Sequence, residues 1–272
     1  MYLCRILLLC LLSSSALAEP SLRVATAASF RPTLAKIASA FTTRTGIPLV
    51  ISAAATGVLY TQISHGARYD ILLAADQAHV DRLVKAGYGV ADSSFTYAQG
   101  QLVLVGQSAL PVTPDAVATG LARDGVRLAL ANPRIAPYGI AAEQALSALG
   151  LADKSRPQRI LGQNAGQAFQ FFSSGNVDYA LVSLAQWRNW RHGHAERVWP
   201  VPANLYQAIK QYAVLLKNSD HTDSASHSLA LTPGVSGHRL KKSILVALQL
   251  LPLALFLLQA WLPEKSHLPA QL

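Results

Sequence analysis

The sequence predicts an α/β protein of two lobes, each a mixed β-sheet flanked by helices, with a ligand cleft between the lobes. Three observations lead to this prediction. Strand-like and helical stretches alternate from Leu22 onward, which is typical of a sheet covered by helices. A second block of the same kind begins at Gln101. Finally, the strand-like stretch Gln211–Leu216 would bring the chain back to the first block.

Apolar periodicity and glycines define the elements of the first lobe. Leu34, Ile37 and Phe41 recur at helical spacing, and Gly46 ends that helix. The predicted strands are Leu22–Ala27, Ile47–Ser52 and Asp70–Ala74, and the predicted helices run over Pro32–Thr43, through Leu59 and Ile63, and through Val80, Leu83 and Val84.

The second lobe shows the same alternation. Its predicted strands are Gln101–Val105, Arg127–Ala131 and Tyr179–Val182, and its predicted helices are Ala141–Leu149 and Gly166–Ser173. We therefore expect a signal peptide at 1–18, lobe I at 19–100 plus 211–237, lobe II at 101–210, and an apolar C-terminal tail at 238–272.

The N-terminus has the pattern of a secretory signal peptide. Arg5 supplies a basic start, Ile6–Leu12 an apolar stretch, and Ala16–Ala18 a small-residue cleavage site before Glu19. Cys4 and Cys10 lie in this segment, so the mature chain has no cysteine for a disulfide, a thiol nucleophile or a metal site. We expect a periplasmic protein.

Composition narrows the function classes. Charged residues make up 14% of the chain and hydrophobic residues 51%, which is typical of a protein with large cores. Despite a net charge of +9, Lys and Arg are scattered singly, apart from a group at Arg239, Lys241 and Lys242. This distribution argues against nucleic-acid binding, while a mild basic bias suits attraction of an anion.

Three turns place small or hydroxyl residues where a strand gives way to a helix: Ala27–Phe30, Ala55–Gly57 and Pro137–Gly139. Helix N-termini expose unpaired N–H donors and the positive end of the helix dipole, which together favour an oxyanion. Ser29 and Thr56 are expected to add hydroxyl donors and to cap their helices. Taken singly, each turn is explained as a helix cap; taken together, and without a charged residue, they favour reversible anion binding.

The chain resembles the periplasmic molybdate-binding proteins, type II members of the periplasmic binding-protein superfamily. Order and spacing agree from about Leu22 to Lys217. The stretches that carry the resemblance are Val24–Phe30, Ala55–Ile63, Tyr69–Asp76, Gly100–Val105, Ala131–Pro133, Ala136–Ala141, Gly162–Phe171 and Gly175–Ser183.

The resemblance implies a tetrahedral oxyanion, molybdate or tungstate, held in the cleft by hydroxyls and backbone N–H groups. Ser29 and Thr56 would each give a hydroxyl and an N–H, with Thr56 standing where a serine is usual. Tyr138 and Ala165 would each give a backbone N–H. Ser183 stands where some members have a tyrosine that binds the anion.

Several residues suggest other chemistry. Asp70 and Asp76 resemble a catalytic or metal-binding pair, but we expect Asp76 to cap a helix and Asp70 to precede a buried strand. His192 and His194 lie among arginines without an Asp or Cys companion, so we expect them in a solvated loop and not at a metal site. The tryptophans Trp187, Trp190 and Trp199 are expected to pack lobe II. Ser29 has no nucleophile-elbow motif around it, so we expect neither an enzyme nor a cofactor.

The C-terminus departs from the family pattern after Asn218. Ser243–Leu262 is almost wholly apolar and about as long as a membrane-spanning helix. Three interpretations remain open: a membrane anchor, a helix packed on lobe I, and a tail altered by a change of reading frame.

The sequence therefore favours a monomeric binding protein that delivers molybdate or tungstate to the permease and ATPase of an ABC transporter. The alternatives are a binding protein for sulfate, phosphate or ferric iron, and a membrane-tethered oxyanion sensor.

Overall fold

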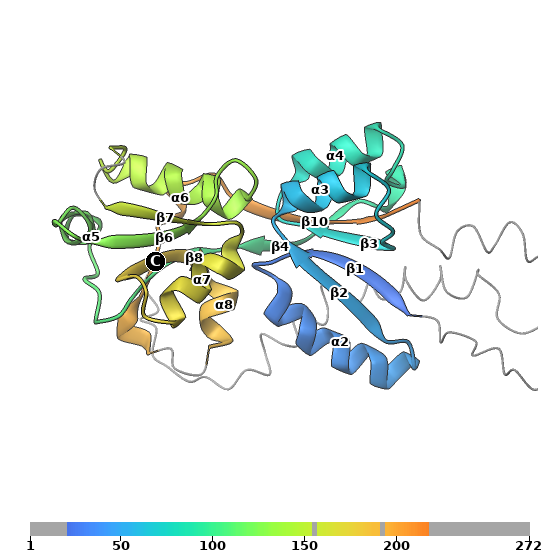
Figure 1. Cartoon of the computed structure of the whole chain (residues 1–272), viewed down its shortest axis with the longest axis horizontal. Helices are drawn as coiled ribbons and strands as arrows, with labels where there is room; N and C mark the ends of the chain where they lie inside the picture. The colour runs from blue at the N-terminus through green and yellow to red at the C-terminus, as the bar shows by residue number, and fades with distance from the viewer. Residues whose placement is uncertain (1–20, 154–156, 191–193, 218–272) are drawn as a thin grey trace, which may run out of the picture.

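The computed structural model describes residues 21–153, 157–190 and 194–217 of the chain. They form two α/β lobes that lie side by side, and strands β4 and β10 run at the junction between them (Figure 1). The type of fold predicted from the sequence is confirmed at this level.

Lobe I contains a five-stranded sheet in the order β2-β1-β3-β10-β4. Strands β2, β1 and β3 are parallel, and β10 is antiparallel to both β3 and β4. The strands are β1 Leu22–Ala27, β2 Leu49–Ala54, β3 Ile71–Ala74, β4 Phe95–Gly100 and β10 Ile209–Leu215.

Lobe II repeats this arrangement with a sheet in the order β7-β6-β8-β5-β9. Here β7, β6 and β8 are parallel, and β5 is antiparallel to β8 and β9. The strands are β5 Leu102–Gly106, β6 Arg127–Ala131, β7 Gln158–Gly162, β8 Tyr179–Ser183 and β9 Val198–Pro200.

Helices cover both faces of each sheet (Figure 1). In lobe I, Leu34 of α2 packs on one face, and Leu59 of α3 with Leu83 of α4 packs on the other. In lobe II, α6 and α7 take the corresponding places. The helices are α2 Arg31–Thr45, α3 Thr56–Ser64, α4 Gln77–Lys85, α5 Pro114–Leu121, α6 Pro137–Ala148, α7 Ala165–Ser173 and α8 Leu184–Arg188, with short 3₁₀ turns η2 Ala91–Ser93, η3 Ala195–Arg197 and η4 Ala203–Leu205.

The boundaries differ from the sequence prediction in several places. Strand β2 lies two residues further along than the predicted Ile47–Ser52, so Ala53 and Ala54 belong to the strand, which extends to the predicted turn at Ala55. The parallel register with β1 explains the shift, because Leu49 pairs with Leu22 at the start and Ala54 with Ala27 at the end. Elements β4, α5, β7, α8 and β9 were not predicted.

The apolar stretch Ser243–Leu262, like the predicted signal peptide, lies outside the described residues. Within the described ranges, no helix combines the length and the apolar character that a membrane span requires.

Candidate functional site

The first residues of four helices meet where the two lobes touch. Helices α2 and α3 follow the carboxyl ends of β1 and β2, and α6 and α7 follow those of β6 and β7. The carboxyl ends of parallel strands in open α/β sheets are where ligands bind. A single buried cluster joins small residues of lobe I (Ala27, Ala55, Ala75) with residues at the starts of α6 and α7 (Ala136, Tyr138, Ala165).

Ser29 lies in the turn between β1 and α2 and is only 3% exposed. Its Oγ is buried and has no hydrogen-bond partner within the part of the chain that the structure describes. A buried hydroxyl without a partner carries a desolvation cost of about 1–3 kcal/mol. The Ser29 hydroxyl is therefore a donor that only a ligand or water would satisfy.

Thr56 is the first residue of α3 and is fully buried. Its Oγ1 accepts a hydrogen bond from the Ala75 N–H at 3.1 Å. A hydroxyl that accepts one bond keeps its own proton to donate. Ala75 thus holds Thr56 in place while leaving it able to donate.

The predicted capping roles of Ser29 and Thr56 are wrong. The N-cap residues of α2 and α3 are Phe30 and Ala55, and neither helix has a side-chain cap. Ser29 lies one residue before the cap position and Thr56 one residue after it. From these positions their hydroxyls do not bond to the first turn, which leaves the helix-start N–H groups uncapped by side chains.

Tyr138 and Ala165 lie in the first turns of α6 and α7, and both are buried. Gly139 lets α6 start directly against the end of β6, because a Cβ there would collide with the backbone from Ala131 to Pro133. The carbonyl of Ala165 accepts a hydrogen bond from Gln186 Nε2 at 2.9 Å.

Ser183 is buried and caps α8 in a capping box with Gln186. Its Oγ donates to the carbonyl of Ser29 in the other lobe at 3.2 Å, and Gln186 Oε1 lies at 3.1 Å. A serine hydroxyl has one proton, and these two acceptors already compete for it. Ser183 is thus placed to join the two lobes.

Further direct contacts hold the lobes together around these helix starts. The Gly57 N–H of α3 donates to the carbonyl of Ile135 of lobe II at 3.0 Å. A Cβ on Gly57 would lie 3.0 Å from the same oxygen, and a Cβ on Gly166 would lie 3.5 Å from Ala28. The contact at Gly166 is an ordinary van der Waals distance, whereas the glycine at position 57 allows the two backbones to approach closely.

A buried polar network lies behind the site, at the strands that connect the lobes. The Tyr138 hydroxyl forms hydrogen bonds with Ser183 and Gln211. Gln211 Oε1 in turn accepts from the Tyr97 hydroxyl at 2.8 Å. Gly100 lies against this network, because a Cβ there would overlap the Tyr138 hydroxyl. The backbone of Tyr138 therefore lies at the start of α6, and its hydroxyl lies beside β4 and β10, the strands at the junction of the lobes.

We expect the protein to lose stability as the pH rises above about 10. Burial raises the pKa of Tyr138 well above its ordinary value of 10.0, and nearby Tyr206 raises it further, while the hydrogen bonds with Ser183 and Gln211 oppose the shift. Burial, and to a lesser extent Tyr138, also raises the pKa of Tyr97. When folding raises the pKa of a group, that group contributes stability at pH values below its pKa in the unfolded chain. The contribution is lost as the pH rises above that value toward the pKa in the folded protein. Melting temperatures between pH 8 and 11 measure this loss.

The variant Y138F should show a shallower fall of melting temperature with pH. The matched control is Y69F, because the Tyr69 hydroxyl bonds to Gln62 in a solvent-exposed setting. Equal slopes in wild type, Y138F and Y69F would contradict the assignment of the titration to the buried network.

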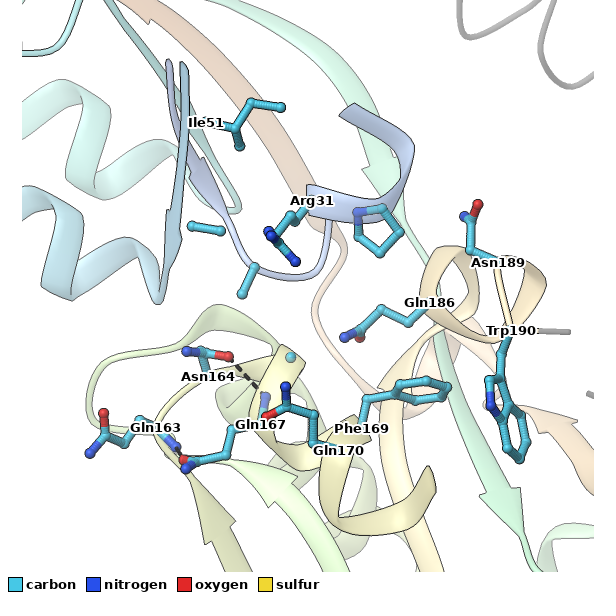
Figure 2. A pocket seen from close by; sticks show the side chains of 14 residues that line it. Arg31, Ile51, Gln163, Asn164, Gln167, Phe169, Gln170, Gln186, Asn189 and Trp190 are labelled. Carbon is cyan, nitrogen blue, oxygen red and sulfur yellow. Dashed lines mark hydrogen bonds between the residues drawn. The ribbon is translucent and has the colours of Figure 1, made fainter. Parts of the chain in front are cut away.

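The mouth of the interlobe junction is a cavity of about 620 Å³. Ala28, Gly166 and Gln186 line it, so it lies directly beside the turns that carry Ser29 and Ala165. Amide side chains and two aromatic rings form much of its wall (Figure 2). Ser29, Thr56 and Tyr138 are buried and do not line the cavity.

The residues that suggested other chemistry have structural roles. Asp76 caps α4 by accepting from the His79 N–H at 2.8 Å, and Asp70 is buried and accepts from the Arg23 N–H at 2.7 Å, as predicted. His192 lies outside the described residues, and the described ones contain no cluster of three potential metal-binding side chains. Trp187 and Trp199 pack in lobe II as predicted, whereas Trp190 packs there and also lines the cavity.

Sequence reasoning missed Gln186, Gln211 and Arg31. Gln186 and Gln211 are buried amides inside predicted or neighbouring regular elements, and buried glutamine signals a specific hydrogen-bonding role. Their burial could not be inferred without the fold. Arg31 follows the first turn directly, and its position at a helix start was the available signal.

Comparison with known proteins gives consistent matches. Residues 22–230 match the family model described as bacterial extracellular solute-binding protein. The molybdate-binding protein ModA of Azotobacter vinelandii is 38% identical over 204 residues, which cover 75% of this chain and 80% of that protein. ModA of Rhodobacter capsulatus is 37% identical over 193 residues, covering 71% and 75%. The solved structure of the Azotobacter vinelandii periplasmic molybdate-binding protein has a TM-score of 0.68 at 33% identity and covers 84% of this chain and 97% of its own.

Proposed function

The chain belongs to the family of bacterial extracellular solute-binding proteins, and from this premise we propose that it binds molybdate or tungstate in the periplasm and delivers the oxyanion to an ABC transporter. The permease and ATPase of that transporter would be its partners, and the protein would act as a monomer without catalysing a reaction.

The observation that carries this proposal is the buried hydroxyl of Ser29, which has no hydrogen-bond partner in the described part of the chain. It lies at the start of α2, where the lobes meet and where the helix-start N–H groups have no side-chain cap. An oxyanion between the lobes would accept from this hydroxyl and offset its desolvation cost.

We assign the oxyanion to donors from both lobes. Ser29 and Thr56 of lobe I would each donate a hydroxyl and an N–H. Tyr138 and Ala165 of lobe II would each donate a backbone N–H. Ser183 would act indirectly, since its proton already has acceptors in Ser29 and Gln186. Because donors come from both lobes, anion binding would stabilise their contact.

Neutral donors suit the task of a transport protein. A dianion buried against a fixed cation forms an ion pair that is costly to separate, whereas dipoles bind it strongly yet release it when the lobes part. Molybdate and tungstate have the same charge and shape and nearly the same size, so we propose that both bind. Sulfate has the same charge but is smaller, so its oxygens would not reach all donors at once.

Calorimetric titration of the mature chain from Glu19 tests the function. We expect saturable heat with molybdate and with tungstate, and none with sulfate at the same concentrations. Phosphate serves as a second control anion. A folded protein, shown by a cooperative melting transition, that gives no heat with molybdate would overturn the proposal.

A further inference from the structure

Arg31 occupies a distinctive place at the mouth of the junction. It is the first residue of α2, two positions after Ser29, and its exposed side chain lines the cavity. Among the described residues that line this cavity, it is the one charged side chain. Figure 2 shows its guanidinium extending from α2 into the space between the lobes, toward the amides of α7 and α8.

Packing and local electrostatics give Arg31 no structural role. No described residue forms a hydrogen bond or ion pair with its guanidinium, and the first turn of α2 contains no acidic residue. A cation at a helix N-terminus also faces the positive end of the helix dipole, which is unfavourable. An anion that approaches the cavity would relieve both effects.

The opposite wall offers a neutral, polar surface. Gln163, Gln167, Gln170 and Asn189 line it, and each carries an amide that can both donate and accept. Such a surface neither repels an anion nor holds it by charge. The cavity is therefore lined by one cation and several neutral amides. It lies beside the turns that carry Ser29 and Ala165, since Ala28 and Gly166 line it.

We propose that Arg31 is a capture residue that attracts the oxyanion into the mouth and does not remain bound to it in the inner site. This inference rests on the proposed function. A single charge in a cleft raises the local concentration of an oppositely charged ligand, which increases the association rate constant in a salt-dependent way. Arg31 is exposed in the mouth, whereas the proposed donors are buried and do not line the cavity. Arg31 would therefore affect the association of the anion and not its retention in the inner site.

Stopped-flow tryptophan fluorescence with molybdate tests the inference, because Trp190 lines the same cavity. At low salt we expect R31Q to lower the association rate constant about three- to tenfold and R31E to lower it further. The dissociation rate constant should change less than twofold. At about 0.5 M salt the association rate constants of wild type, R31Q and R31E should converge, because charges are then screened over a distance of a few ångströms.

The matched control is R44Q, which removes the same charge from the last turn of the same helix. By the rise of an α-helix, Arg44 lies about 20 Å from Arg31, and it does not line the cavity. At about 0.1 M ionic strength this distance is about twice the screening length, so R44Q should then associate like wild type. An unchanged association rate constant in R31Q would overturn the inference, as would a loss of affinity that arises from faster dissociation. Wild type that shows no molybdate binding at equilibrium would instead overturn the proposed function, and the inference with it.

Discussion

Replacing Ser29 by alanine should weaken molybdate binding about 10- to 150-fold without lowering the stability of the ligand-free protein. A hydrogen bond to a charged acceptor contributes about 1.5–3 kcal/mol, which corresponds to that loss of affinity. In the ligand-free protein the Ser29 Oγ is buried and has no hydrogen-bond partner among the described residues, so its removal takes away a desolvation cost. Affinity and stability should therefore change in opposite directions.

Calorimetry gives the affinity and thermal unfolding gives the stability of S29A. The control is S39A, the same chemical change at an exposed position of the helix that follows Ser29, which should leave the affinity unchanged. If S29A destabilises the ligand-free protein while its molybdate affinity stays at the wild-type value, Ser29 has a structural role and the assignment fails.

The second large effect is expected at the junction of the lobes, where G100A should reduce both the free energy of unfolding and the affinity for molybdate. A Cβ on Gly100 would overlap the Tyr138 hydroxyl and lie 3.0 Å from Gln211 Nε2. Overpacking of this kind costs about 1–3 kcal/mol. Relief requires movement of Tyr138, whose backbone N–H is one of the proposed anion donors, so molybdate affinity should fall as well.

A double-mutant cycle with Y138F identifies the clash. Alone, Y138F should cost about 1–2 kcal/mol, because it removes hydrogen bonds from buried Gln211 and Ser183. In G100A it also removes the overlapping atom, so the double variant should lose less stability than the sum of the single variants. The control is G120A in α5, where a Cβ meets no atom within 4 Å and which should fold normally. Strict additivity of G100A and Y138F would contradict the network.

The regular elements that the sequence predicted are those with strong apolar patterns. Strands β3 and β5 are buried along their whole length and read as unbroken apolar runs. Strand β7 pairs only with β6 at the edge of its sheet, and β9 has three residues. Edge strands and very short strands need no strong apolar pattern in the sequence, because hydrogen bonding to a neighbouring strand fixes their extended conformation.

The candidate site was predictable as a set of turns and not as a network. Helix starts with small and hydroxyl residues are local features, so the turns that carry Ser29, Thr56 and Tyr138 could be proposed from the sequence, whereas Ala165 was proposed only from the family resemblance. The bond between Ser183 and Ser29 joins residues 154 positions apart, and that between Tyr97 and Gln211 joins residues 114 apart. Such contacts depend on how the lobes meet, which local sequence does not determine.

A crystal structure of the mature chain with molybdate, located by the anomalous scattering of molybdenum, tests the central claim most directly. We expect the metal atom between the starts of α2, α3, α6 and α7. The hydroxyls and N–H groups of Ser29 and Thr56 should lie about 3 Å from its oxygens, and the Arg31 guanidinium should not touch them. An anion bound to Arg31 or to another charged side chain, away from Ser29, would contradict the account.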